Sequence, residues 1–237
     1  MSDQIEFLIR HLPNLLVGFP NNRPGGLLLS VLLSAGTIAL GFVLATIVGF
    51  SFHSRSRVIR FFAGRFVWLI RGIPLIVLLV LLFQILGTGI VFGLELSSFW
   101  AAVVTLTLYA AAYQADIVRA GIAAVPAQLI EDARVLGAPR STVVRTITVP
   151  YAVRVMRPAL VTQAITIFKD SSVVVVLGVA DLTTTARIVL GSDITNAPFW
   201  VATYLMVGLL YWVVAYGLAR IARPRRGPQL APEVALS

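Results

Sequence analysis

The sequence has no cysteine and a single lysine, Lys169, among its 237 residues. Without cysteine the chain has no disulfide, no thiolate metal site and no cysteine nucleophile. No glycine-rich phosphate loop precedes the lysine, so a Walker-type ATP site is absent from this sequence. If this protein takes part in an ATP-driven process, another subunit binds the nucleotide.

Charged residues are also scarce, at 12%, whereas 58% of residues are hydrophobic. The mean hydropathy of +0.92 indicates a polytopic membrane protein. A net charge of +9 is compatible with a nucleic-acid partner, but the arginines cluster beside hydrophobic segments, which is the pattern of cytoplasmic membrane loops. We therefore expect membrane lipid and no nucleic acid among the partners. The isolated histidines His11 and His53 indicate neither a metal site nor a catalytic site.

Five apolar segments are long enough to cross a bilayer if the fourth, centred on residues 158–168, extends back to Thr146. They predict an all-α integral membrane protein with five transmembrane helices. The segments are residues 27–52, 66–89, 96–115, 146–168 and 197–219.

Arginine-rich loops at residues 53–65, 119–157 and 220–226 predict the orientation, because such loops face the cytoplasm. The N-terminus then faces outward. Residues 1–26 lack the basic start of a signal peptide and predict a periplasmic or interfacial helix broken by Pro13 and Pro20. Residues 27–222 form the transmembrane domain, and residues 223–237 form a cytoplasmic tail.

The stretch from Asp116 to Pro150 is too charged for lipid and contains a short amphipathic helix between Pro126 and Gly137. Its expected apolar face carries Leu129, Ile130, Ala133 and Leu136. Two interpretations remain open: a helix resting on the membrane surface, or a helix that docks on a partner.

Two further polar sites interrupt the apolar segments. Residues 71–74, Arg-Gly-Ile-Pro, predict a kinked helix or an open backbone facing a translocation path. Residues 169–171, Lys-Asp-Ser, lie at the end of the fourth segment, either at the outer interface or deeper in the bilayer beside partners or water. Asp116 and Arg119 are spaced to form a structural i,i+3 ion pair.

The blocks around these sites resemble one known family. Glu131, Ala133, Gly137, Ile147 and Pro150 are spaced as in the EAA loop of binding-protein-dependent ABC transporter permeases. Residues 68–75, 112–122, 169–172 and 179–182 are similar, in the same order, to blocks of the polar amino acid permease family. The resemblance covers residues 25–220 and implies the type I permease fold of ABC importers.

The resemblance implies that residues 126–138 are a cytoplasmic coupling helix held by an ATPase subunit. Contact residues would be Glu131, Asp132, Ala133, Gly137 and Pro150. It assigns the substrate pathway to Arg71, Gly72, Ile73, Pro74, Lys169, Asp170 and Ser171. The chain departs from the family at Asp132 (usually alanine), Val149 (commonly leucine), Ala127 (often glycine) and Ile73 (more often threonine).

The resulting interpretation is a permease subunit of an amino acid importer in a bacterial inner membrane, not itself an enzyme. Expected partners are an ATPase dimer that binds ATP and magnesium, a second permease subunit and a periplasmic binding protein. Ile73 slightly favours a heterodimer over a homodimer. Arg71 and Lys169 would suit glutamate or aspartate. The alternatives are an ATP-independent channel, a permease for another small solute, and a membrane-embedded enzyme.

Overall fold

The computed structural model describes residues 2–19, 24–88, 93 and 95–222. These residues form helices and no strand. The α-helices are α1 (Ser2–Val17), α2 (Gly26–Ser51), α3 (Arg57–Gly72), α4 (Leu75–Gly87), α5 (Ser98–Ala123), α6 (Ala127–Val135), α7 (Arg140–Val143), α8 (Val149–Asp170), α9 (Leu182–Gly191) and α10 (Trp200–Ala222). A π-helical turn, η1 (Val144–Thr148), and two 3₁₀ segments, η2 (Ser171–Leu177) and η3 (Ile194–Phe199), connect them.

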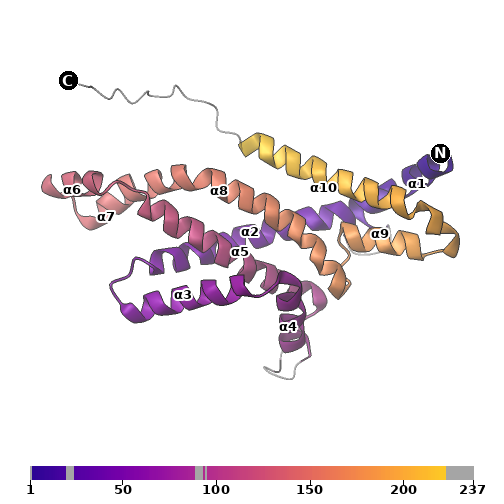
Figure 1. Ribbon diagram of the computed structural model, residues 1–237, viewed down its shortest axis with the longest axis horizontal. Coiled ribbons are helices and arrows are strands. Elements are labelled where there is room, and N and C mark those ends of the chain that lie inside the picture. Colours follow the sequence, from indigo (N-terminus) through magenta and orange to yellow (C-terminus); the bar gives the residue numbers. More distant parts are fainter. Residues whose placement is uncertain (1, 20–23, 89–92, 94, 223–237) are drawn as a thin grey trace.

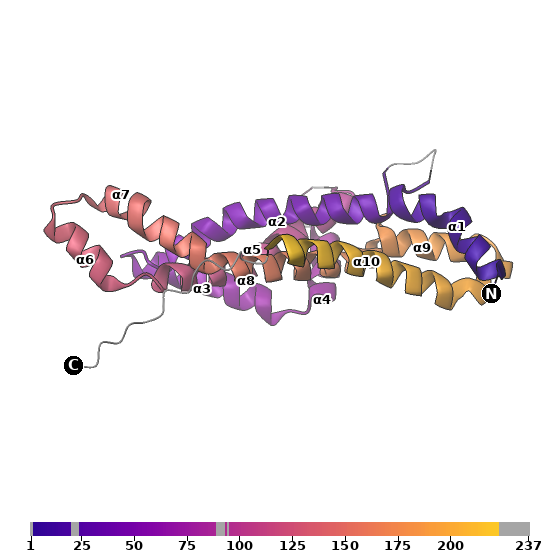
Figure 2. The same cartoon turned by 90° about the horizontal axis from the view of Figure 1, so that it is seen from above.

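The long helices α2, α5, α8 and α10 follow the long axis of the molecule (Figures 1 and 2). Helices α6 and α7 form one end, α1 and α9 form the other, and α4 projects sideways. The predicted cytoplasmic tail, residues 223–237, lies outside the described residues.

Helices α2 and α5 pack most closely, because small residues line the face of α2 that meets α5. Thr37, Gly41, Ala45 and Gly49 recur every fourth position and are all buried. A Cβ atom at Gly41 would lie 2.7 Å from the Ala110 Cβ atom. Such small-residue stripes let membrane helices approach until their backbones are nearly in contact.

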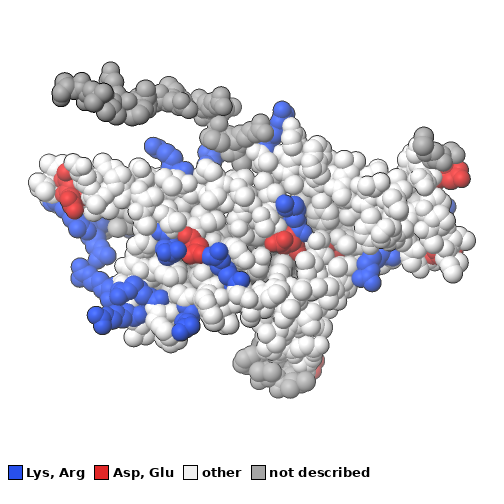
Figure 3. All heavy atoms as spheres, viewed as in Figure 1, with Lys and Arg blue, Asp and Glu red and all other residues white. Residues whose placement is uncertain are grey.

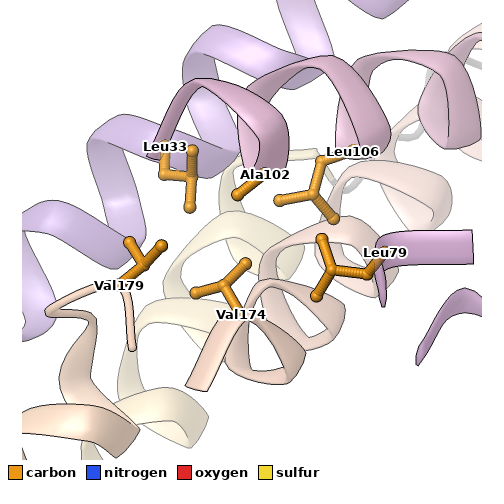
Figure 4. Packing of buried hydrophobic residues seen from close by; sticks show 6 residues of the cluster. All are labelled: Leu33, Leu79, Ala102, Leu106, Val174 and Val179. Carbon is orange, nitrogen blue, oxygen red and sulfur yellow. The ribbon is translucent and has the colours of Figure 1, made fainter. Parts of the chain in front are cut away.

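The central hydrophobic cluster joins α2, α4, α5 and the segment after α8. Leu33, Leu79, Ala102, Leu106, Val174 and Val179 point toward one another (Figure 4). Since lipid is as apolar as these side chains, the cluster stabilises the bundle mainly by dense packing.

The predicted spans match helices at four places, and three of these helices extend several residues beyond a predicted end. Four helical segments, residues 26–51, 98–123, 140–177 and 194–220, are long and apolar enough to cross a membrane. The third predicted span extends to Ala123, so Asp116 and Arg119 belong to it. The fourth begins at Arg140, because α7, the π-helical turn and α8 run on from one another.

The second predicted span is not one kinked helix. It consists of α3 and α4, which meet at an angle of 109° and count as a fifth span only when taken together. Pro74 has no N–H group, and it forces the preceding Ile73 out of the helical region, to φ −104° and ψ 130°. The expected locally open backbone is therefore present, as a sharp break between two short helices.

The N-terminal helix differs from the expected broken interfacial helix. Pro13 lies inside α1 without ending it, and Pro20 lies outside the described residues. Leu15 is fully buried against Leu182, Ala186 and Val207. Helix α1 is thus packed on α9 and α10.

A buried carboxylate, Asp181, fastens this end of the bundle. It accepts hydrogen bonds from the Thr184 backbone N–H (2.8 Å) and the Tyr211 hydroxyl (3.2 Å). The neighbouring Leu182 N–H donates to the Ser30 hydroxyl at 3.1 Å. These bonds join the N-terminus of α9 to α10 and α2. Burial raises the pKa of the Asp181 carboxyl group, while the hydrogen bonds from Thr184 act in the opposite direction.

We expect Asp181→Ala to lower the free energy of unfolding by about 1–3 kcal/mol, because it removes a helix cap and the hydrogen bond that the Tyr211 hydroxyl donates to the carboxylate. Asp193→Ala, which removes the exposed cap of η3, is the matched control and should cost less. Thermal unfolding in detergent measures both. Equal losses would contradict the prediction.

The stability of the protein should also depend on pH through Asp181. Because the pKa of its carboxyl group is raised in the folded state, the free energy of unfolding should fall as the pH rises through this pKa. Asp181→Asn should remove that dependence.

Candidate coupling surface and charged cluster

Helix α6 lies at one end of the molecule, and both of its ends are sharply defined. Pro126 precedes its first residue. At its other end the Gly137 N–H donates to the Arg134 carbonyl (2.9 Å) and the Ala138 N–H donates to the Ala133 carbonyl (3.0 Å). This pair of bonds is a Schellman motif, and Gly137 adopts the left-handed φ of +80° that it requires. The predicted closing role of Gly137 is confirmed.

Among the residues that the structure describes, few cover the surface of α6, and none of the residues of α6 is buried. Only Ile130 packs on the cluster of Val118, Val125, Ala152 and Met156. Val135 and Leu136 are 87% and 86% exposed. The four residues of the predicted apolar face differ in exposure within this chain: Ile130 and Ala133 are half-buried, whereas Leu129 and Leu136 are exposed. An apolar tip of this kind is typical of a docking element.

The residues predicted to contact an ATPase do not all lie together. The acidic side chains of Glu131 and Asp132 are exposed on α6, and Ala133 is half-buried. Gly137 forms the turn that follows. Pro150, in contrast, lies in the first turn of α8, beyond the π-helical turn. The candidate coupling surface is therefore formed by Glu131, Asp132, Ala133, Val135, Leu136 and Gly137.

Basic side chains gather around the same end, where α3 begins and where α6 and α7 lie (Figure 3). The middle of this face is mostly uncharged, and the few charged groups there lie in clusters that contain both signs (Figure 3). This distribution agrees with the clustering of arginines expected from the sequence.

A charged cluster formed by Arg71, Asp116 and Arg119 lies where α3 ends beside α5. The Arg71 guanidinium forms an ion pair with Asp116 Oδ2, and Arg119 Nη2 lies 3.2 Å from Asp116 Oδ1. The predicted Asp116–Arg119 pair is confirmed, and the structure adds Arg71 to it. Tyr113 lies beneath the Arg71 guanidinium, 4.9 Å from ring centre to carbon.

Two hollows open on either side of this cluster. One, of about 500 Å³, lies toward α3 and is also lined by Phe52 and Trp68. The other, of about 480 Å³, lies toward α8 and is lined by Met156 and Gln163. Both sizes are within the range of small-molecule pockets.

The predicted pathway residues fall into two separate groups. Arg71 and Gly72 line the first hollow, and Ile73 and Pro74 form the break beside it. Lys169, Asp170 and Ser171 lie at the end of α8 and line neither hollow. Ser171 is buried and donates to the Phe168 carbonyl at 2.7 Å, which is a local structural role.

Sequence reasoning missed Tyr113 and Gln163 as members of this site. Tyr113 lies three residues before Asp116 on the same helix, so the helical period could have placed it there. Gln163 is on α8, and its position beside α5 depends on packing between helices far apart in the sequence.

The comparisons with known proteins agree with this architecture. The family model for the binding-protein-dependent transport system inner membrane component matches residues 37–227. The arginine transport system permease protein ArtQ of Bacillus subtilis is 29% identical over 198 residues, which are 84% of this chain and 88% of that protein. A putative glutamine transport system permease protein GlnP of Rickettsia felis is 28% identical over 184 residues, covering 78% and 81%.

Two solved structures have a similar fold. A crystal structure of an amino acid ABC transporter with histidines has a chain that superposes with a TM-score of 0.78 at 27% identity, covering 91% of this chain and 94% of that chain. The MetNI methionine ABC transporter, in an inward-facing conformation, has a chain at TM-score 0.66 and 22% identity, which covers 94% and 98% and bears on the fold alone. The chain therefore belongs to the family of binding-protein-dependent transport system inner membrane components, and it is an integral membrane protein with the fold of ABC importer permeases.

Proposed function

We propose that the chain carries a polar amino acid across the bacterial inner membrane as the permease subunit of an ATP-driven importer. The observation that carries this proposal is the coupling surface on α6. It presents two carboxylates on α6 and an apolar tip, Val135 and Leu136, at the end of this helix, and the other described residues leave it largely uncovered. A partner of complementary shape with a basic groove would cover it.

The partner of this surface is an ATPase subunit, which supplies the nucleotide site absent from this sequence and holds ATP and magnesium. Closure of two such ATPases pushes on residues 126–138. The Schellman motif at Gly137 turns the chain back toward α8, so a displacement of α6 passes into the membrane through α7 and the π-helical turn.

The basic residues near α6 support a cytoplasmic position for this end and a periplasmic position for α1, where a binding protein would deliver the substrate. A second permease subunit completes the pathway, since one bundle of this size cannot surround it. Ile73, in place of the more usual threonine at the α3–α4 break, favours a heterodimer.

The substrate proposal is a polar amino acid, with glutamate or aspartate as candidates. It is supported by the names of relatives, which are permeases for arginine and glutamine, and by the charged cluster, whose two guanidiniums and one carboxylate leave one positive charge. An amino acid carboxylate suits such a surface.

Reconstitution tests this function directly. The chain, its ATPase and its binding protein are placed in liposomes, and uptake of labelled amino acids is measured with and without ATP. A thermal-shift screen of the binding protein identifies the substrate. We expect uptake to require ATP hydrolysis. Uptake that is independent of ATP would instead indicate a channel, and absence of uptake of every amino acid would refute the substrate class.

A further inference from the structure

The charged cluster Arg71–Asp116–Arg119 contains two positive groups and one negative group, all of them partly exposed. Asp116 and Arg119 belong to the membrane-crossing helix α5, and Arg71 lies near the end of α3 beside it. The side chains of Arg71, Arg119 and Asp116 are 41%, 50% and 26% exposed. Exposure of a charged group to hydrocarbon is unfavourable. The exposed parts of these side chains therefore face water or a polar ligand.

Each arginine of the cluster stacks on an aromatic ring. A ring contact uses the face of the guanidinium and none of its N–H groups, so these remain available as hydrogen-bond donors. Arg71 stacks on Tyr113, and Arg119 lies 5.4 Å from the centre of the Phe52 ring. Each guanidinium has five N–H donors, and each contributes only part of them to Asp116. The oxygens of Asp116 likewise keep lone pairs. The cluster thus offers several cationic donors beside one anionic acceptor.

An α-amino acid has the complementary arrangement, with a carboxylate and an ammonium group on one carbon. We propose that the charged cluster binds this zwitterionic part of the transported amino acid: Arg71 and Arg119 take the α-carboxylate, and Asp116 takes the α-ammonium. This assignment rests on the proposed function and adds the residues that recognise the substrate within the membrane.

Gln163 would bind the side chain of the substrate. It lines the hollow between the charged cluster and α8, and its amide nitrogen is buried without a hydrogen-bond partner among the described residues. A buried polar atom left unpaired costs free energy that a ligand recovers by bonding to it. A substrate side chain that ends in an amide or a carboxylate supplies that bond.

The test uses the intact complex of this chain with its ATPase, without binding protein, so that only the membrane site selects. Radiolabelled glutamine, glutamate and arginine serve as probes in equilibrium dialysis. Unlabelled desamino analogues, which lack only the α-ammonium group, compete with the probe that binds. Glu95→Gln, which changes an exposed carboxylate outside the cluster, is the matched control.

For Asp116→Asn we expect the affinity for the amino acid to fall by about tenfold or more, while the affinity for its desamino analogue stays constant, because a bond between charged groups is lost. Gln163→Leu should leave zwitterion recognition intact and remove the preference of the site for the bound probe over norleucine. Co-elution with the ATPase shows that each variant is folded.

Equal changes for the amino acid and its desamino analogue would show that Asp116 is only structural and would overturn the assignment. A wild-type complex that binds no probe would overturn it as well. ATP-driven uptake in liposomes separates the two proposals: uptake without binding at this site leaves the proposed function standing, whereas absence of uptake removes both.

Discussion

Glu131→Arg is expected to abolish the coupling between ATP hydrolysis and transport. Glu131 lies exposed on α6, a helix with no buried residue. Replacing its carboxylate by a guanidinium turns an attraction to a basic groove into a repulsion. Loss of one partner in a buried interfacial charge pair costs about 2–5 kcal/mol, so complex formation should weaken about thirtyfold or more. Co-elution with the ATPase and substrate-stimulated ATP hydrolysis measure it.

Gly137→Asp should have a comparable effect by a different physical route. The left-handed φ of +80° at Gly137 disfavours any residue with a Cβ atom, so the turn after α6 distorts and its apolar tip moves. Glu95→Arg, a reversal of an exposed charge on a loop far from α6, is the control and should couple normally. If both Glu131→Arg and Gly137→Asp retain full complex formation and stimulated hydrolysis, α6 is not the coupling element.

Gly41→Val is expected to separate α2 from α5 and to destabilise the whole bundle. A Cβ atom at Gly41 meets the Ala110 Cβ atom at 2.7 Å and the Ala111 backbone nitrogen at 3.2 Å. The second contact is with backbone, so no side-chain rotation relieves it. Overpacking typically costs about 1–3 kcal/mol, and valine adds two methyl groups beyond that Cβ atom. The melting temperature should fall by roughly 5–10 °C.

Gly36→Val provides the comparison on the same helix. A Cβ atom at Gly36 would have no neighbour within 4 Å, so the same change of residue lacks the clash with α5. The melting temperature of this variant should stay close to that of the wild type. If the two variants unfold at the same temperature, the α2–α5 contact is not the close one described.

The apolar segments predict the membrane helices well because hydrophobic length is a local property. Residues 27–52 match α2 almost residue for residue. The ends of the helices are harder to predict. Asp116 and Arg119 are too polar for a membrane helix by hydropathy, yet α5 continues through them because Asp116 is paired with Arg71 from another helix. Arg71 on α3 neutralises the charge of Asp116, and the hydropathy of the α5 sequence contains no information about this contact.

The candidate site is predictable only in part for the same reason. The turn at Gly137 follows from local geometry and is confirmed. The joining of Arg71 to Asp116, and the position of Gln163, depend on contacts between α3, α5 and α8. The angle of the α3–α4 break is equally non-local: Pro74 requires an interruption, but the packing around α4 determines that it becomes 109°.

The bare tip of α6 has a consequence for the life of the protein in the cell. Val135 and Leu136 are almost fully exposed, and exposed apolar patches promote self-association. A copy that has not yet met its ATPase would carry a surface resembling that of a misfolded protein. Synthesis in excess of the ATPase should therefore end in aggregation or proteolysis, so that the supply of ATPase limits the number of importers.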